Sequence, residues 1–140
     1  MADKLSREER KRNMQAIRSK KTFLENKIIT ELWRNKYRFR RNVNSLFGHP
    51  DIAIKKYRIV IFIDSCFWHG CSSHYQAPIT NADYWYAKVK RNIERDTDVT
   101  AYYQNSGWNI LRIWEHEIKN DFFCVIKKIQ DFIDAVKQNE

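Results

Sequence analysis

Glycine, proline and long apolar runs are all scarce in this 140-residue chain. With three Gly, two Pro and no stretch built from Ser, Gly, Pro or Gln, long linkers are excluded, and nearly the whole chain is expected to fold as one domain. Apolar runs such as Ile59 to Ile63 are far shorter than the roughly 18 residues of a membrane span, and the N-terminus is charged. Neither a membrane anchor nor a signal peptide is therefore expected. The three cysteines are an odd number, and in a reducing compartment closely spaced cysteines are better candidates for metal ligands than for disulfide partners; the cytoplasm is the expected address.

Acidic residues are also scarce in the first third of the chain. Residues 1–45 contain 14 Lys and Arg against 5 Asp and Glu, whereas residues 46–140 contain 12 of each sign, so the first third carries the whole net charge of +9. Clustered cations suit a polyanion, because each neutralised phosphate releases counterions. Nucleic acid is the favoured partner, and a solvated, soluble surface is the alternative. Residues 1–21 have few apolar anchors and are predicted to form a basic DNA-binding arm that orders on binding, ahead of a folded domain over residues 22–140.

Apolar spacing predicts the elements of that domain. Thr22 and Glu25 form a capping-box pattern, which predicts a helix from Thr22 to about Lys36. Strands are predicted for the apolar stretches at residues 37–43, 51–54, 58–63 and 108–114, the third of them buried on both faces. Further helices are predicted from Asn81 to Gly107 and after Asn120 or Asp121. This order predicts a single α/β domain with a mixed sheet flanked by helices.

Carboxylates near the strand ends are candidates for chemistry. Asp51 opens a hairpin strand and faces residues 63 and 64 across the turn, where it is placed to hold a hard cation such as Mg²⁺; capping of the turn is the plainer interpretation. Asp64 is either a second ligand or the residue at which its strand enters solvent. Glu25 has an adequate role as the return residue of the capping box.

Two cysteines and two histidines lie in a long irregular loop over residues 64–80. Cys66, Cys71 and His74 have the spacing and chemistry of tetrahedral Zn²⁺ ligands, and scattered loop residues are the alternative. His116 is the best candidate for the fourth ligand. Its competitor Cys124 lies on the last helix, where a free cysteine usually behaves as a small core residue.

The same loop carries His69, Phe67 and Trp68. His69 is a ligand, a general acid or base, or a hydrogen-bonded structural histidine, and spacing alone does not choose among these roles. Two adjacent bulky rings cannot easily both be buried, so one or both are candidates for contact with a partner. Insertion of aromatic rings between base steps is a known way to kink DNA.

Several segments together carry a family resemblance. In chain order they are Met14-x-x-Ile17-Arg18-Ser19-Lys20, Gly48-His49-Pro50-Asp51, Ile61-Phe62-Ile63-Asp64-Ser65-Cys66-Phe67-Trp68-His69-Gly70-Cys71, Asn81-x-x-Tyr84-Trp85-x-x-Lys88-x-x-x-Asn92-x-x-x-Asp96 and Gly107-Trp108-x-x-Leu111-x-Ile113-Trp114-Glu115. Over about residues 12–117 this pattern resembles the very short patch repair (Vsr) DNA mismatch endonucleases. The resemblance implies a restriction-endonuclease-like fold, whose helix, three strands, helix and strand agree with the predicted order.

The resemblance also implies an activity, which is Mg²⁺-dependent nicking of one DNA strand beside the thymine of a T:G mismatch during repair. Asp51 and the backbone carbonyl of Ile63 would bind Mg²⁺, and Glu25 would act through a metal-bound water. His69 would be the general acid or base, oriented by a hydrogen bond to Asp96. Zn²⁺ would only stabilise the loop.

Further residues are implied to contact DNA. Phe67, Trp68 and Trp85 would wedge into the duplex near the mismatch, and Met14 would enter from the opposite side. Arg18 and Lys20 of the arm would join them as DNA-binding residues.

One departure from the usual nuclease pattern concerns Asp64. The usual Glu-x-Lys is replaced by Asp64-Ser65-Cys66, which has no lysine to activate water, so His69 would carry more of the proton transfer and Asp64 would add a ligand. Two other functions stay open: a restriction-type nuclease on unmismatched or modified DNA, and a non-catalytic zinc-stabilised DNA-binding module, which has no use for Asp51 with His69. The protein is expected to be a monomer in the prokaryotic cytoplasm. Association with a cytosine-5 methyltransferase is a further expectation, which only genome context would indicate.

Overall fold

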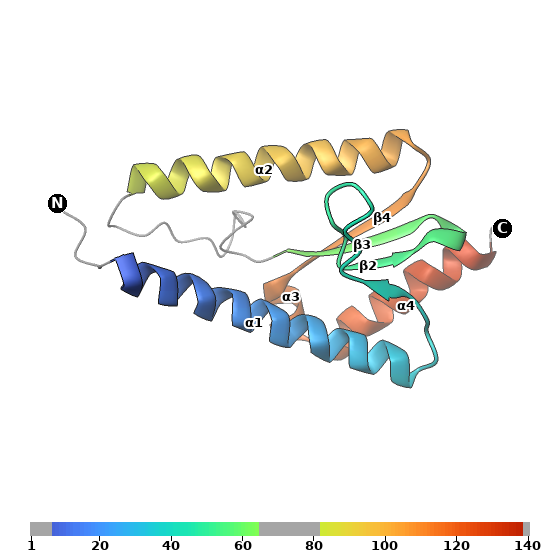
Figure 1. The fold of residues 1–140 in the computed structure, drawn as a ribbon. Helices are drawn as coiled ribbons and strands as arrows, with labels where there is room; N and C mark the ends of the chain where they lie inside the picture. The colour runs from blue at the N-terminus through green and yellow to red at the C-terminus, as the bar shows by residue number, and fades with distance from the viewer. Residues whose placement is uncertain (1–6, 65–81, 139–140) are drawn as a thin grey trace.

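The computed structural model describes residues 7–64 and 82–138 (Figure 1). Its elements, in chain order, are α1 (Arg7–Arg34), β1 (Arg40–Arg41), β2 (Ile52–Ile54), the 3₁₀ turn η1 (Lys55–Tyr57), β3 (Ile59–Asp64), α2 (Ala82–Asn105), β4 (Asn109–Trp114), α3 (Glu115–Asn120) and α4 (Phe122–Gln138). Among these described helices, none combines the length and the apolar character that a membrane crossing requires.

The four strands form one mixed sheet in the order β1-β2-β3-β4. β1, β2 and β3 pair antiparallel, whereas β3 and β4 run parallel. Every residue of β3 is buried, as expected for a β-branched strand covered on both faces. The predicted mixed sheet, with the Ile-rich strand at its interior, is confirmed.

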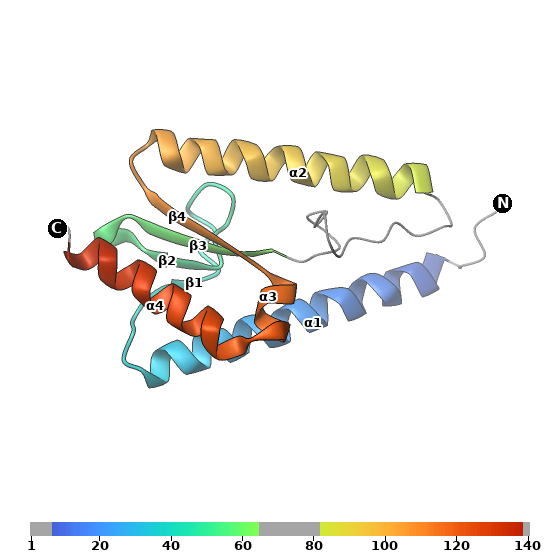
Figure 2. The ribbon, with the colours of Figure 1, turned by 180° about the vertical axis from the view of Figure 1, so that it is seen from behind.

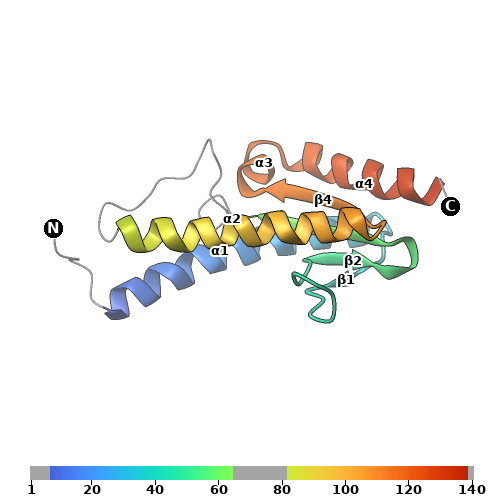
Figure 3. The same cartoon turned by 90° about the horizontal axis from the view of Figure 1, so that it is seen from above.

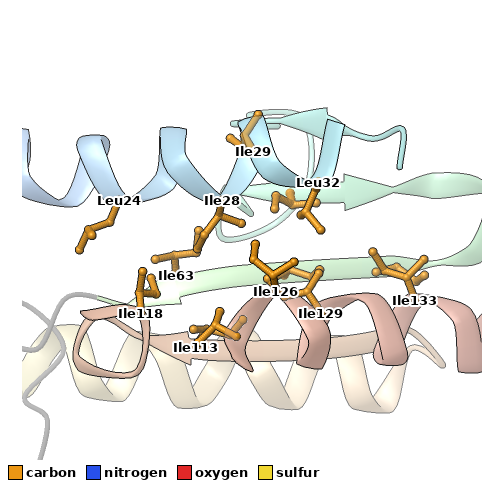
Figure 4. Close-up of a cluster of buried hydrophobic side chains, with 14 residues drawn as sticks. Leu24, Ile28, Ile29, Leu32, Ile63, Ile113, Ile118, Ile126, Ile129 and Ile133 are labelled. Carbon is orange, nitrogen blue, oxygen red and sulfur yellow. The ribbon is translucent and has the colours of Figure 1, made fainter. Parts of the chain in front are cut away.

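Helices cover both faces of the sheet (Figures 1 and 2). α1 and α4 lie on one side, here called the α1/α4 face, and α2 runs along the other, here called the α2 face, as the view from above also shows (Figure 3). The larger core cluster fills the α1/α4 face and consists of Leu, Ile and Val (Figure 4). A smaller cluster lies under α2 and includes Phe62, Val99 and Tyr103.

The first helix differs from its prediction, because it begins at Arg7 and runs through Thr22 without a break. The expected start at Thr22 is wrong. An N-cap residue has non-helical backbone angles, which Thr22 lacks because it lies inside the helix. The residues before Thr22 have a high helix propensity, since they are rich in Arg, Lys, Glu, Met, Gln and Ala, and the helix therefore begins earlier. Among the side chains of α1 that the structure describes, the buried core residues lie in the second half of the helix, from Leu24 to Leu32, and Trp33 is 44% exposed. The DNA-binding role of residues 1–21 stays a prediction.

Two other elements differ from the expected order. The strand expected over residues 37–43 shrinks to the two residues of β1, because Asn42 adopts a positive φ of 51° and turns the chain. The short helix α3 was not predicted. Tyr37 and Phe39 still pack against the larger core cluster, so their apolar character was interpreted correctly.

The last helix begins as predicted after Asp121, whose Oδ1 accepts a hydrogen bond from the Cys124 N–H at 3.1 Å. Its buried side is formed by Val125, Ile126 and Ile129 with Ile133. Cys124 is exposed, so its assignment as a small core residue is wrong. Its place in the helix explains this, because at about 100° per residue it lies roughly 200° from Ile126, on the outer side.

Candidate active site

Asp51 lies at the mouth of the β2–β3 hairpin. Because Ile52 pairs with Ile61, Asp51 comes level with the end of β3, and its Oδ2 accepts a hydrogen bond from the Ile63 N–H at 2.7 Å. The Asn42 N–H donates to the Asp51 carbonyl at 2.9 Å and fixes the backbone as well. The prediction that this carboxylate faces residue 63 is confirmed.

The loop over residues 44–50, which leads into Asp51, is held from above by α2 (Figure 1). The Tyr103 hydroxyl donates a hydrogen bond to the Phe47 carbonyl at 2.5 Å, and the Phe47 ring packs edge-on against Tyr102. Burial, and secondarily the neighbouring Tyr102, raises the pKa of Tyr103, which therefore stays a hydrogen-bond donor. α2 thus helps to set the position of Asp51.

Gly48 packs closely against α2. It has a φ of +77°, and a Cβ placed on it would lie 2.7 Å from a methyl carbon of Val99. Both the backbone angle and the lack of space require glycine here.

Glu25 is a buried carboxylate on α1, with 8% of its surface exposed. The next residue, Asn26, accepts a hydrogen bond from the Arg41 guanidinium at 2.5 Å, and Arg41 pairs with Ile52, the neighbour of Asp51. This chain of contacts places the turn of α1 that carries Glu25 beside the strand end that carries Asp51. Since α1 continues through this turn, the role of Glu25 as the return residue of a capping box is wrong.

Asp64 ends β3 and is 3% exposed, so the alternative that it marks the exit of the strand into solvent is wrong. Both of its carboxylate oxygens accept hydrogen bonds from Nη1 of Arg112, at 3.0 and 3.2 Å. The Arg112 guanidinium also donates to the backbone carbonyl of Asp96 at 3.1 Å, and a carboxylate oxygen of Asp96 lies 3.9 Å from it. Asp96 of α2 and Asp64 of β3 are therefore brought together around one cation.

His116 lies in the first turn of α3, immediately after β4. Its ring stacks on Trp114 with 6.4 Å between centroids, and the Trp114 N–H donates to Glu117 at 2.8 Å, which fixes the start of the helix. Burial acts to raise the pKa of Glu117, but the Trp114 N–H and Lys128 outweigh it and lower the pKa. Since Trp114 pairs with Asp64, His116 is held at the edge of the sheet where the 65–81 segment begins.

Comparison with known proteins identifies the family. The model of the DNA mismatch endonuclease Vsr family matches residues 2–75, slightly more than half of the chain and the part that includes Glu25, Asp51 and Asp64. This chain belongs to the Vsr family.

Relatives with related names cover most of the chain. A type II nicking enzyme of Neisseria meningitidis serogroup C is 37% identical over 133 residues, which are 94% of this chain and 90% of that relative. A type II nicking enzyme of Lentzea aerocolonigenes is 41% identical over 122 residues, 84% of this chain and 74% of the relative. The DNA mismatch endonuclease Vsr of Escherichia coli (strain K12) is 35% identical over 116 residues, 82% of this chain and 74% of the relative. As a Vsr-family member, the chain is a DNA endonuclease, and its mixed sheet between helices is consistent with a restriction-endonuclease-like fold.

Several residues expected to act in a Vsr endonuclease fall outside the described residues, namely Cys66, Phe67, Trp68, His69, Cys71 and His74. For Met14, Arg18, Lys20 and Trp85 only the helical backbone is described, in α1 and α2. Within residues 7–64 and 82–138 no group of three or more His, Cys, Asp or Glu side chains is placed to hold a metal ion.

Arg112 was missed by sequence reasoning. A groove of about 350 Å³ lies beside it on the α2 face, lined among others by Asp64, Asp96 and Trp114. The signal was present, since Arg112 is the one charged residue within the strand Asn109–Trp114, and a charged side chain that is largely buried needs a partner.

Proposed function

We propose that this Vsr-family endonuclease nicks one strand of double-stranded DNA beside the thymine of a T:G mismatch in a Mg²⁺-dependent reaction. The observation that carries the proposal is the Asp51 carboxylate, held against the Ile63 N–H at the end of β3 in a chain that matches the Vsr family over this region. The names of its relatives, nicking enzymes and a mismatch endonuclease, support cleavage of one strand.

The donor atoms near the end of β3 fit a hard cation. Asp51, the backbone carbonyl of Ile63 and, through water, Glu25 offer only oxygen, which Mg²⁺ prefers, and they come from neighbouring elements. These residues would hold the ion, which when bound would neutralise charge on the scissile phosphate and lower the pKa of the attacking water. The hydrogen bond from the Ile63 N–H keeps the Asp51 carboxylate oriented toward this edge.

The remaining chemistry falls to side chains of the chain itself. His69 would move the proton to or from the reacting oxygens, with Asp96 fixing its tautomer. Phe67, Trp68 and Trp85 would insert into the duplex, where a mismatch reduces the cost of unstacking, and Met14, Arg18 and Lys20 would hold it from α1. Cys66, Cys71, His74 and His116 would bind structural Zn²⁺.

A nicking assay tests the proposal. Labelled duplexes that contain T:G, another mismatch or T:A are incubated with the protein, with and without Mg²⁺. We expect one Mg²⁺-dependent nick on the T:G duplex. Asp51→Asn should abolish it while DNA affinity stays within a few-fold, because this residue acts on the reacting phosphate rather than on the duplex as a whole. Asp98→Asn, at an exposed acidic position of α2, is the matched control and should nick normally. No nick on any duplex would instead favour a DNA-binding module without catalysis.

A second candidate is nicking of unmismatched or modified duplex. The relatives from Neisseria and Lentzea are named type II nicking enzymes, which favours this second function. The same assay separates the two, since equal rates on T:G and T:A duplexes would select the second function. A cytosine-5 methyltransferase encoded nearby would favour the first, because deamination of 5-methylcytosine creates T:G pairs.

A further inference from the structure

Arg112 lies on the α2 face, beside the aromatic ring of Phe62. It pairs with Phe62 across β3 and β4, and its guanidinium carbon lies 4.5 Å from the centre of the Phe62 ring. Only 20% of its side chain is exposed. Placing a guanidinium here is costly unless its N–H groups are bonded, so its partners have to be fixed in position.

Those partners lie on two separate elements. Nη1 bonds both carboxylate oxygens of Asp64 at the end of β3, whereas Nε donates to Oγ1 of Thr100 at 2.8 Å and Nη2 to the carbonyl of Asp96 at 3.1 Å. Asp96 and Thr100 are one turn apart on α2, so Arg112 donates its hydrogen bonds to one side of that helix. The planar guanidinium fork satisfies these acceptors together, which a lysine cannot do.

The hydrogen bonds of Arg112 connect α2 to the end of the sheet that carries Asp51. Asp64 directly follows Ile63, and the N–H of Ile63 holds the Asp51 carboxylate. A continuous series of contacts thus runs from Asp51 through Ile63 and Asp64 to Arg112, and from Arg112 to Asp96.

From this geometry we infer that Arg112 is a positioning residue for strand nicking, which fixes α2 at Asp96 and Thr100 against the end of β3 that holds Asp51. Asp64 belongs to the same network as the counter-ion of Arg112. The inference rests on the proposed nicking activity. It assigns a role to Arg112, which is not among the site residues expected from the sequence.

Paired threonine variants give the sharpest test. Thr100→Val removes the acceptor of Arg112 Nε with little change of shape. Thr97→Val is the control three residues earlier on the same helix, since its hydroxyl donates instead to the Ile93 carbonyl within α2 at 3.0 Å. Arg112→Gln removes the guanidinium hydrogen bonds to Asp64, Thr100 and the Asp96 carbonyl, and Arg112→Lys keeps only a positive charge near Asp64. The full-length variants are assayed on the T:G duplex with enzyme in excess, well below their melting temperatures, together with DNA affinity and thermal stability.

We expect Thr100→Val to slow nicking at saturation roughly two- to tenfold, the value of one hydrogen bond, and Thr97→Val to leave it unchanged. Arg112→Gln should slow nicking by more than about tenfold with DNA affinity within about threefold, and Arg112→Lys should recover thermal stability more than rate.

Other outcomes would overturn the inference. They are a folded Arg112→Gln protein that nicks at the wild-type rate, equal losses of rate and affinity, or a lower melting temperature with an unchanged rate. If Arg112→Gln does not fold, equal rates for Thr100→Val and Thr97→Val overturn it. A wild-type protein that nicks no duplex would overturn the proposed function and this inference together, whereas the outcomes above concern Arg112 alone.

Discussion

The two faces of the sheet are built from different interactions. On the α1/α4 face, fourteen described side chains are buried together, and all of them are Leu, Ile or Val. On the α2 face the buried cluster is smaller, and it is bordered by the Tyr103 hydroxyl, Gly48 and the Arg112 network. Apolar burial stabilises without specifying direction, whereas hydrogen bonds fix distance and angle. The comparison indicates that the first face mainly supplies stability, whereas the second fixes the position of the loop and the strand end that carry Asp51.

The largest expected effect on stability comes from the α1/α4 face. Ile129 of α4 is fully buried, so Ile129→Ala should lower the free energy of unfolding by about 2–5 kcal/mol through lost burial and a cavity. Urea unfolding measures this loss, and Ile93→Ala at a 42% exposed site of α2 is the control, with an expected change within about 0.5 kcal/mol. Nicking by folded Ile129→Ala protein at low temperature should be normal. A large loss of rate there would contradict the division between the faces.

Gly48→Ala is the next largest change, and it lies on the α2 face. The left-handed backbone alone should cost about 1–2 kcal/mol, and the contact with Val99 should add to this. Gly107→Ala is a matched control, because Gly107 has the same φ of +77° but no atom lies within 4 Å of the position that its Cβ would occupy. The difference in unfolding free energy between the two variants therefore isolates the contact. Gly48→Ala should also slow nicking, and Val99→Ala in the same chain should partly restore it; no restoration would place the defect elsewhere.

Tyr103→Phe should have a smaller effect on stability, about 1 kcal/mol, because it removes one hydrogen bond to the Phe47 carbonyl and keeps the ring. Its effect on nicking should exceed that of Tyr102→Phe, which preserves the ring contact with Phe47. Single-turnover rates of the two variants, measured at equal DNA saturation, test this ordering. Equal rates would mean that the loop before Asp51 does not depend on this bond.

The smallest expected effect is on stability at alkaline pH, and it concerns Tyr37, which packs on the α1/α4 face. Burial, and then the hydrogen bond and charge of Asp134, raises the pKa of Tyr37 from 10.0 to about 12. The folded protein therefore holds this proton more tightly than the unfolded chain, so its stabilising effect is complete below pH 10 and is lost as the pH rises toward 12. Tyr37→Phe should make stability less dependent on pH between 10 and 12. Parallel urea titrations of the two proteins check the slope, and identical slopes would exclude Tyr37 as its source.

Local sequence patterns predicted the parts of the fold that depend on local physics. The buried strand from Ile59 to Ile63, the cap at Asp121 and the end of the second long helix near Gly107 follow from side-chain branching, cap chemistry and the freedom of glycine. The helix start at Thr22 failed because a capping pattern does not end a helix whose preceding residues favour the helical state. α3 was missed because it is a single short element with one buried residue, Ile118.

The candidate site was predicted in part. The approach of Asp51 to residue 63 follows from hairpin register, which the sequence constrains. The pairing of Asp64 with Arg112 joins residues 48 positions apart, and no local pattern encodes it. Cys124 could have been placed on the outer side of α4 by helical spacing, which outweighs the average tendency of cysteine to be buried.

The parallel pairing of β3 with β4 also bears on how the enzyme folds. Ile54 meets Ile59 across a tight turn, but Ile59 meets Asn109 only after a crossover of 50 positions. Closing so long a loop is entropically unfavourable, and folding slows as native contacts become more distant in sequence. The β2–β3 hairpin, with Asp51 at its mouth, can therefore form well before β4 pairs with β3 and brings Arg112 to Asp64. In a chain still emerging from the ribosome, Asp51 would be in place but the complete active site would not. We therefore expect the ability to cleave DNA to arise only once synthesis has passed β4.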